Sequence, residues 1–282
     1  MKPTEPPRGI QTWIHILEEG KGQVWLRRLL GLILVAICAA LYQVNEARNF
    51  RSPEAMDAAQ LGRNLAAGRG YSTGVIRPLS LHLLEEQAAA RGQNPRDVIV
   101  REHPDLENPP VYPVLLAGLF KTMPASWWTR LPADEYRRRP MEEVVISAFN
   151  LALFGAALLL VGFLGTRLFD PTAGVVAAAL LFGTEPLWNL ANSGLPTLLL
   201  MVLVLVLVHL LLSFEQESAQ PVPRSGRLSA LALGCGLLVG VLFLTRYSFG
   251  LLALPVTGYL AWRGVGRRLR VAGLALAGVL LL

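Results

Sequence analysis

Five apolar segments follow one another through the second half of the chain, separated by short polar connections. They are Val144–Leu164, Thr172–Leu190, Leu195–Leu212, Leu228–Leu244 and Phe249–Trp262. A helix rises 1.5 Å per residue, so about 20 apolar residues cross a hydrocarbon core of about 30 Å. Inside a bilayer such segments satisfy their backbone hydrogen bonds within a helix. The sequence therefore predicts an all-α polytopic membrane protein.

The composition agrees with this class and excludes several others. Of the 282 residues, 53% are hydrophobic and 16% are charged, against about 25% charged in an average soluble domain. A cytosolic enzyme, a disordered chain and a disulfide-stapled secreted module are excluded. The net charge of +6 comes largely from arginines at the ends of apolar segments, where they contact lipid headgroups. We therefore expect membrane lipid as a partner, and no nucleic acid.

The order of polar and apolar stretches divides the chain into four parts. We predict a cytoplasmic interfacial segment over residues 1–28, a first transmembrane helix over 29–47, a large extracytoplasmic loop over 48–143, and a transmembrane bundle over 144–282. The bundle would hold about six further spans. The last begins at Val271 and has crossed little more than half of a bilayer core at Leu282. We expect this chain to be a fragment of a longer protein.

The distribution of arginines predicts the topology. With the N-terminus in the cytoplasm, the cytoplasmic connections carry Arg167, Arg224, Arg227 and the cluster Arg263–Arg270, whereas the short outside loops carry only Arg246. This follows the positive-inside rule. The run Val111–Phe120 is too short to span and is predicted to lie in the interface or to re-enter the membrane. The Ala/Leu-rich and Arg-rich composition favours a bacterial inner (plasma) membrane.

The large loop is predicted to be helical. Ser52 and Pro53 fit the N-cap and N1 positions of a helix, and Gly68 and Gly70 fit its end. A second helix is expected around Leu81–Arg91, and a third begins near Pro109.

Three segments of the chain together resemble one family. They are Glu54–Leu65 followed by Gly68–Tyr71, the run Pro109–Ala117 (PPVYPVLLA), and Gly165–Gly174 (GTRLFDPTAG) with the spans that follow it to Arg246. In this order and spacing they are similar to the GT-C superfamily of polyprenyl-phosphate-sugar-dependent membrane glycosyltransferases. The protein mannosyltransferase and aminoarabinose transferase branch is the most similar. The resemblance implies a GT-C-like transmembrane helix bundle with a large helical first extracytoplasmic loop.

The resemblance also implies a reaction and its residues. A hexosyl or pentosyl group would pass from a polyprenyl-phosphate carrier to an acceptor on the extracytoplasmic face, often with inversion, and a carboxylate would act as base. Asp57 is the better chemical match to the catalytic Asp of the family, whereas Glu54 lies nearer to it in the alignment. The two residues are three positions apart on one helix. Both also fit as ordinary first-turn carboxylates that interact with the helix dipole.

Cations are expected to meet the phosphate of the carrier. Arg246 is the first candidate, although it also fits as an arginine that snorkels to lipid headgroups. Arg77 and His103 in the large loop are weaker candidates.

The chain departs from the family at one point. A second Asp, common where the family's chain re-enters the membrane, is absent from the stretch 192–197, and Glu185 is the residue that could replace it. A divalent metal is therefore a possible cofactor without an assigned ligand.

Two other functions remain open. One is a non-catalytic scaffold or accessory subunit with membrane protein partners, favoured by the missing carboxylate. The other is a fragment of a transporter, for which Gly194 and Pro196 offer a helix break.

Overall fold

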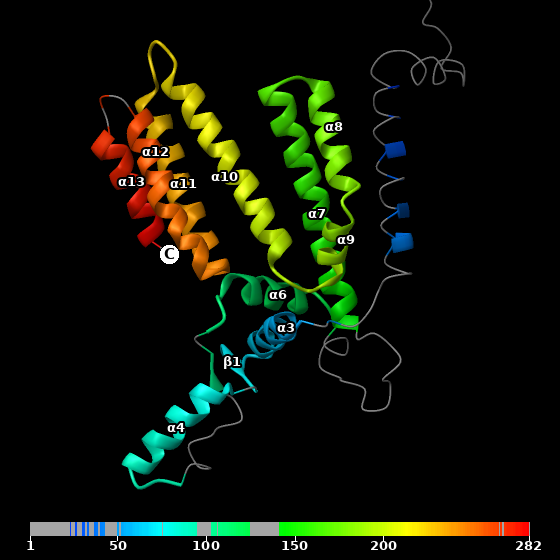
Figure 1. Ribbon diagram of the computed structural model, residues 1–282, viewed down its shortest axis with the longest axis vertical. Helices are drawn as coiled ribbons and strands as arrows, with labels where there is room; N and C mark the ends of the chain where they lie inside the picture. The colour runs from blue at the N-terminus through cyan, green and yellow to red at the C-terminus, as the bar shows by residue number, and fades with distance from the viewer. Residues whose placement is uncertain are drawn as a thin grey trace, which may run out of the picture. The chain divides into compact units, whose positions relative to one another are not determined.

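The computed structural model divides the chain into two compact units, Met1–Ala47 and Arg48–Leu282. It describes ten positions between 23 and 42 (23, 26, 30, 31, 33, 37, 38, 40, 41 and 42), then 50, 52–74, 76–94, 103–105, 107–124, 141–264, 266 and 268–281. In the first unit the described positions are all helical (Figure 1). Most of the predicted interfacial segment, 1–28, and parts of the first span lie outside the described residues.

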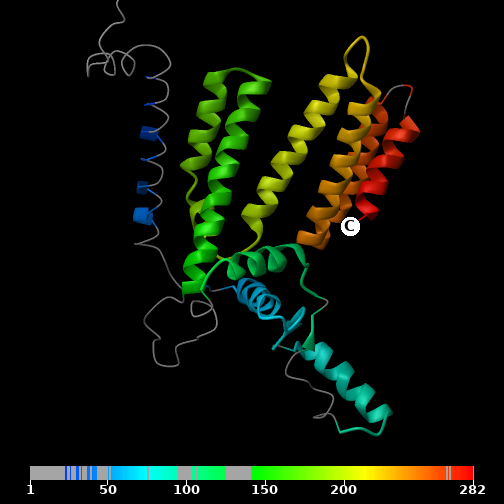
Figure 2. The same ribbon diagram turned by 180° about the vertical axis from the view of Figure 1, so that it is seen from behind.

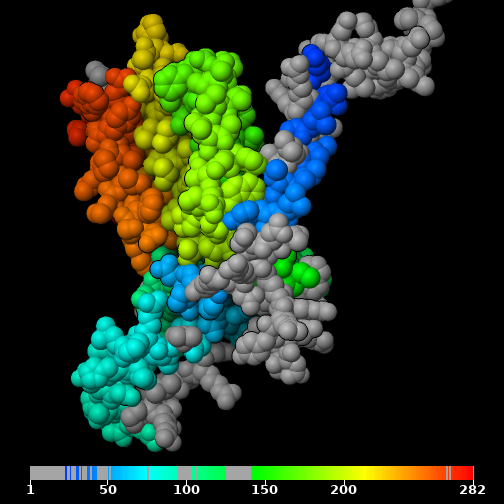
Figure 3. All heavy atoms as spheres, turned by 45° about the vertical axis from the view of Figure 1, so that its right-hand side comes forward, coloured from blue at the N-terminus to red at the C-terminus, as the bar shows by residue number. Residues whose placement is uncertain are grey.

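The second unit contains a helix bundle preceded by a smaller helical segment. Its elements are α3 (Pro53–Ala66), β1 (Ser72–Thr73), α4 (Pro78–Ala90), β2 (His103–Pro104), α6 (Val111–Lys121), α7 (Met141–Leu168), α8 (Pro171–Phe182), α9 (Glu185–Asn192), α10 (Thr197–Ser218), α11 (Ser225–Thr245), the 3₁₀ helix η2 (Tyr247–Leu252), α12 (Ala253–Arg263) and α13 (Arg268–Leu280). In the space-filling view the part from α3 to α4 forms a lobe at one end of the bundle (Figure 3).

The bundle combines antiparallel pairs that follow each other in the chain with two parallel pairs, α7 with α10 and α11 with α13. Helix α8 packs on α7, α10 packs on α7 and α11, and α13 packs on both α11 and α12 (Figures 1 and 2). Among the described residues three helices, α7, α10 and α11, are long and apolar enough to cross a membrane. The all-α polytopic class predicted from the sequence is confirmed.

The predicted span Thr172–Leu190 is two helices rather than one. Helices α8 and α9 meet at a bend of 59°. Pro186 stands at the start of α9, where its missing N–H and its ring prevent the helix from continuing. The carbonyl groups freed by the break find side-chain donors: Trp188 Nε1 donates to Phe182 at 2.7 Å, and Thr184 Oγ1 donates to Leu180 at 3.0 Å. Because these carbonyl groups have hydrogen-bond donors within the protein, the break can lie at membrane depth.

Helices α11 and α13 approach each other through glycine. A Cβ added at Gly236 would lie 2.0 Å from the carbonyl oxygen of Ala275, and one at Gly278 would lie 2.7 Å from that of Leu233. No side chain can occupy such a space. Close backbone approach of this kind is typical of membrane helices, whose association depends on van der Waals packing.

The lobe rests on the bundle through α6. Helix α6 is short, lies across the end of the bundle rather than through it, and carries α3 on its other side (Figures 1 and 2). A Cβ at Gly62 would lie 2.9 Å from that of Leu116, so α3 and α6 touch closely. Their buried cluster includes Phe120, Ile146 of α7 and Leu199 of α10. The prediction that Val111–Phe120 does not span agrees with this placement.

Hydrogen bonds fix α6 to the bundle. The Tyr112 hydroxyl donates to the carbonyl oxygen of Gly194 at 3.0 Å and to Asn150 Oδ1 at 3.3 Å, and Asn150 Nδ2 donates to Leu195 at 3.4 Å. Gly194 has φ +73°, a left-handed conformation that favours glycine. Arg63 of α3 pairs with the buried Glu142 of α7.

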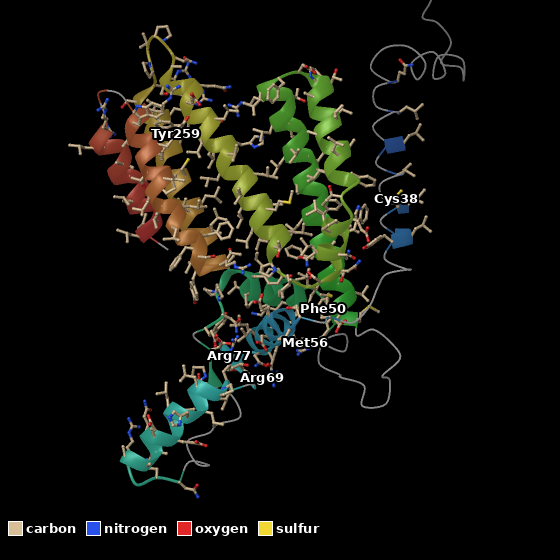
Figure 4. The ribbon with its side chains drawn as sticks, viewed as in Figure 1. Cys38, Phe50, Met56, Arg69, Arg77 and Tyr259 are labelled. Carbon is tan, nitrogen blue, oxygen red and sulfur yellow. The ribbon has the colours of Figure 1, made fainter. Side chains whose placement is uncertain are left out.

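The arginines of the predicted cytoplasmic connections lie at the opposite end of the bundle from α3 and α6, whereas Arg246 lies at the α6 end. Arg167 donates to Ser213 Oγ at 3.1 Å, and Arg263 pairs with Glu215. Figure 4 shows this end around the labelled Tyr259 of α12. The alternation of connections thus agrees with the predicted topology, whereas the cytoplasmic side itself stays a prediction.

Candidate functional site

A cavity of about 340 Å³ lies between α3, the start of α4 and the β1–β2 pair. Three of the predicted site residues line it: Asp57, Arg77 and His103. The remaining lining residues come from the same short stretches of the lobe: Thr73, Ile76, Ser80, Pro104, Asp105, Glu107 and Asn108. In Figure 4 the labelled Arg77 lies beside α3, at the start of α4. Three residues predicted separately from the sequence thus line one cavity, and their roles stay predictions.

The β1–β2 pair brings His103 to α3. Thr73 lies opposite His103 in antiparallel register. The strand β1 is held against α3 by Asn64 Nδ2, which donates to the carbonyl oxygen of Ser72 at 2.6 Å, and by Thr73 Oγ1, which lies 3.4 Å from Gln60 Oε1. Gln60 is one helical turn from Asp57. This register carries residues that are more than 40 positions apart in the sequence to the same cavity.

Asp105 shapes the cavity wall. Its carboxylate accepts hydrogen bonds from the backbone N–H of Glu107 at 2.8 Å, the backbone N–H of Asn108 at 3.0 Å and Asn108 Nδ2 at 2.7 Å. A carboxylate so occupied serves the turn rather than a substrate. Sequence reasoning missed this residue, although an Asp three residues before Asn and four before Pro is a recognisable signal for a turn.

Asp57 is the carboxylate that remains available. Its side chain is 20% exposed, and its Oδ2 lies 3.8 Å from Nη2 of Arg77. The Nε of Arg77 forms an ion pair with Glu107 Oε2, at 2.7 Å. Burial raises the pKa of Asp57, Arg77 lowers it, and the carboxylates of Asp105, Glu107 and Glu54 raise it, with a raised pKa as the result. A raised pKa makes the ionised carboxylate a stronger proton acceptor near neutral pH.

Two other predicted residues lie apart from the cavity. Glu54 occupies the first turn of α3 with an exposed side chain and does not line the cavity. Glu185 is the first residue of α9, exposed at the bend between α8 and α9. It therefore stands within the broken span, eight residues before the loop that leads into α10.

Arg246 lies at the end of α11 that faces α6. It follows the last residue of that helix, is exposed, and has no acidic partner among the described residues. The next residue, Tyr247, is close enough to Tyr71 to contribute to the raised pKa of the Tyr71 hydroxyl. Tyr71 in turn donates to the carbonyl oxygen of Asn108 at 2.8 Å, in the cavity wall. Arg246 thus belongs to the same end of the molecule as the cavity.

The cavity does not fit a divalent cation. Within the described ranges, no three His, Cys, Asp or Glu side chains converge closely enough to hold a metal ion. Asp105 is occupied by its three donors and Glu107 by Arg77. The stretch 192–197 corresponds to the place where the family has its second Asp. In this chain the carbonyl oxygens of Gly194 and Leu195 in that stretch accept hydrogen bonds from Tyr112 and Asn150.

Comparison with known proteins identifies the bundle. The family described as dolichyl-phosphate-mannose-protein mannosyltransferase matches residues 141–282, which is 142 of the 282 residues. No curated protein and no solved structure matches the chain. The match begins at the first residue of α7 and covers the bundle, whereas the cavity lies before it. The GT-C resemblance found in the sequence is confirmed, and the chain belongs to the dolichyl-phosphate-mannose-protein mannosyltransferase family of membrane glycosyltransferases.

Proposed function

We propose that the chain transfers a sugar from a polyprenyl-phosphate carrier to an acceptor hydroxyl in the cavity beside α3, on the extracytoplasmic face. The observation that carries this proposal is Asp57, a half-buried carboxylate with a raised pKa that lines an accessible polar cavity. The family supplies the lipid-linked donor and the membrane setting. Asp57 in the lobe is our candidate for the base.

The chemistry assigned to Asp57 is general base catalysis. Its carboxylate takes the proton of the acceptor hydroxyl, the hydroxyl oxygen bonds to the anomeric carbon, and the bond from that carbon to the phosphate oxygen breaks. Polyprenyl phosphate leaves with the negative charge, which requires a cation. Arg246 stands at the end of the span nearest the lobe and is our candidate for that role.

The test is a transfer assay with the full chain in lipid vesicles. Polyprenyl-phosphate-linked hexoses and pentoses, each labelled in the sugar, are supplied one at a time, and the release of polyprenyl phosphate and the appearance of labelled acceptor are measured. The proposal requires release with at least one donor. Donor that binds without release would instead support the non-catalytic scaffold, which the carboxylate-free stretch 192–197 favours.

Replacing Arg77 by Gln is expected to shift the pH profile of transfer. Arg77 lowers the pKa of Asp57, so its removal raises that pKa further. Transfer needs ionised Asp57 and is lost as the pH falls through its pKa, so the acidic limb moves to higher pH. The initial rate measured between pH 4 and 9, roughly the range in which shifted carboxyl groups titrate, checks this. Arg91→Gln, an exposed arginine just after α4, is the matched control and keeps the wild-type limb.

Replacing Arg246 by Gln is expected to weaken donor binding. A hydrogen bond to a charged group contributes about 1.5–3 kcal/mol, so KM for the donor rises about tenfold or more. Arg246→Lys keeps the charge and recovers part of the affinity. Donor titrations in the vesicle assay measure both variants. An unchanged KM together with an unchanged kcat in Arg246→Gln would assign this arginine to lipid headgroups alone.

A further inference from the structure

A second cavity lies at the opposite end of the bundle from α3 and α6. Its volume is about 350 Å³, and it is bounded by the end of α10, the start of α11 and the connection from α12 to α13. Ser218, Leu228, Arg263, Gly264 and Val271 are among its lining residues. Neither the family match nor the transfer reaction gives this cavity a role.

Arg263 brings an unsatisfied donor to the cavity. One of its terminal nitrogens, Nη2, donates to Glu215, whose other oxygen accepts the Tyr259 hydroxyl at 2.8 Å. Its Nε is buried and has no hydrogen-bond partner among the described residues. The Arg263 side chain as a whole is 35% exposed, but a buried N–H donor without an acceptor is costly. An acceptor oxygen bound in the cavity would satisfy it.

The charges around the cavity favour an anion. Glu215 is neutralised by Arg263, and Glu217 by Arg227, whose Nη1 lies 3.2 Å from Glu217 Oε2. No other acidic side chain stands on the described parts of α10 to α13. Three further arginines there make no side-chain ion pair in the described part of the chain: Arg268, Arg270 and Arg224, whose backbone N–H donates to Glu217 Oε1 at 3.0 Å. The end of the bundle that holds the cavity therefore carries an excess of positive charge.

Aromatic residues place the cavity at headgroup depth. Trp262 is exposed, and the Arg263 guanidinium carbon lies 6.0 Å from the centroid of its ring. Tryptophan and tyrosine gather at the interface between lipid and water. Leu269, which is 91% exposed, offers an apolar surface between Arg268 and Arg270 in the sequence.

We propose that this cavity binds the phosphate group of an anionic phospholipid from the leaflet at this end of the bundle. Basic pockets between membrane helices are known to accept such headgroups. The apolar walls of Leu228 and Val271, with the exposed Leu269 and Trp262, suit a lipid better than a free phosphate ion. This inference does not depend on the transfer reaction.

The experiment uses the purified full chain in detergent and measures bound lipid by native mass spectrometry. Phosphatidylglycerol is the probe, with phosphatidylcholine and inorganic phosphate as separate comparisons. We expect Arg263→Gln to lower the apparent affinity for phosphatidylglycerol about fivefold, the effect of one arginine near the membrane surface. The double variant Glu215→Gln/Arg263→Gln removes the pair together and is expected to show the same loss without leaving an unpaired carboxylate.

Arg167→Gln is the matched control. Arg167 lies at the same end but bonds to Ser213 and Gln216 of α10 and does not line the cavity, so its variant keeps wild-type affinity. Equal losses in the Arg167 and Arg263 variants would show that the overall positive charge at this end of the bundle attracts the lipid. That result would overturn the cavity as a specific site. Equal binding of phosphatidylcholine would overturn the anionic class. Displacement of the lipid by millimolar inorganic phosphate would overturn the lipid as occupant and leave a free-phosphate site.

Discussion

Asp57→Asn is expected to reduce transfer by at least 100-fold, within the range of about 10²–10⁴ that a positioned acid or base contributes. Asparagine has nearly the same size but cannot accept the proton of the acceptor. The initial rate in the vesicle assay measures the loss. Thermal unfolding of the same preparation should be unchanged or slightly improved, because burial raises the pKa of Asp57 and so makes its charged form unfavourable.

Glu54→Gln is the matched comparison for Asp57→Asn. Both residues lie on α3, three positions apart, but Glu54 is exposed and does not line the cavity. Its variant should therefore keep most of the wild-type rate. The reverse pattern, with a large loss in Glu54→Gln and none in Asp57→Asn, would move the base to Glu54 and contradict the site described here.

Gly236→Val is expected to have the largest effect on stability. A Cβ at this position would meet the carbonyl oxygen of Ala275 at 2.0 Å, and backbone cannot move aside as a side chain can. Helices α11 and α13 would have to separate, at a cost of about 3 kcal/mol or more. Thermal unfolding in detergent should show a clear fall in Tm.

Gly226→Val controls for the change of residue type. Gly226 lies on the same helix, and an added Cβ there meets nothing within 4 Å. Glycine and valine have similar helix propensities, within about 0.5 kcal/mol, so the Tm of this variant should stay near that of the wild type. An equally large fall in both variants would show that the helix itself, rather than its contact with α13, is sensitive.

The helices of the loop followed directly from the sequence. Ser52 and Pro53 correctly marked the start of α3, although within the described residues Ser52 makes no side-chain capping hydrogen bond. The second helix begins at Pro78, earlier than the predicted Leu81, because proline is favoured in the first helical turn. Proline and glycine restrict or free the backbone at their own positions, so the helix ends that they mark can be predicted without knowledge of the fold.

The assembly of the cavity could not be predicted in this way. Strands of two residues, Ser72–Thr73 and His103–Pro104, carry no hydrophobic period, so the pairing of β1 with β2 left no trace in the sequence pattern. Asp57, Arg77 and His103 were chosen for their chemistry, and only the fold brings them together. The bend at Pro186 was also missed, because the average hydrophobicity of Thr172–Leu190 concealed one breaking residue.

The attachment of the lobe determines how the cavity can change its width. The wall that carries Asp57 is immobilised, because Arg63 ties α3 to Glu142 of α7, and Tyr112 ties α6 to Gly194. Helix α4, by contrast, packs closely against no other described helix. One wall of the cavity is therefore anchored to the bundle, whereas the wall at the start of α4 is not anchored by another described helix. Under the proposed function the base lies on the anchored wall, so we expect acceptors of different bulk to be accommodated on the α4 side without displacing the carboxylate.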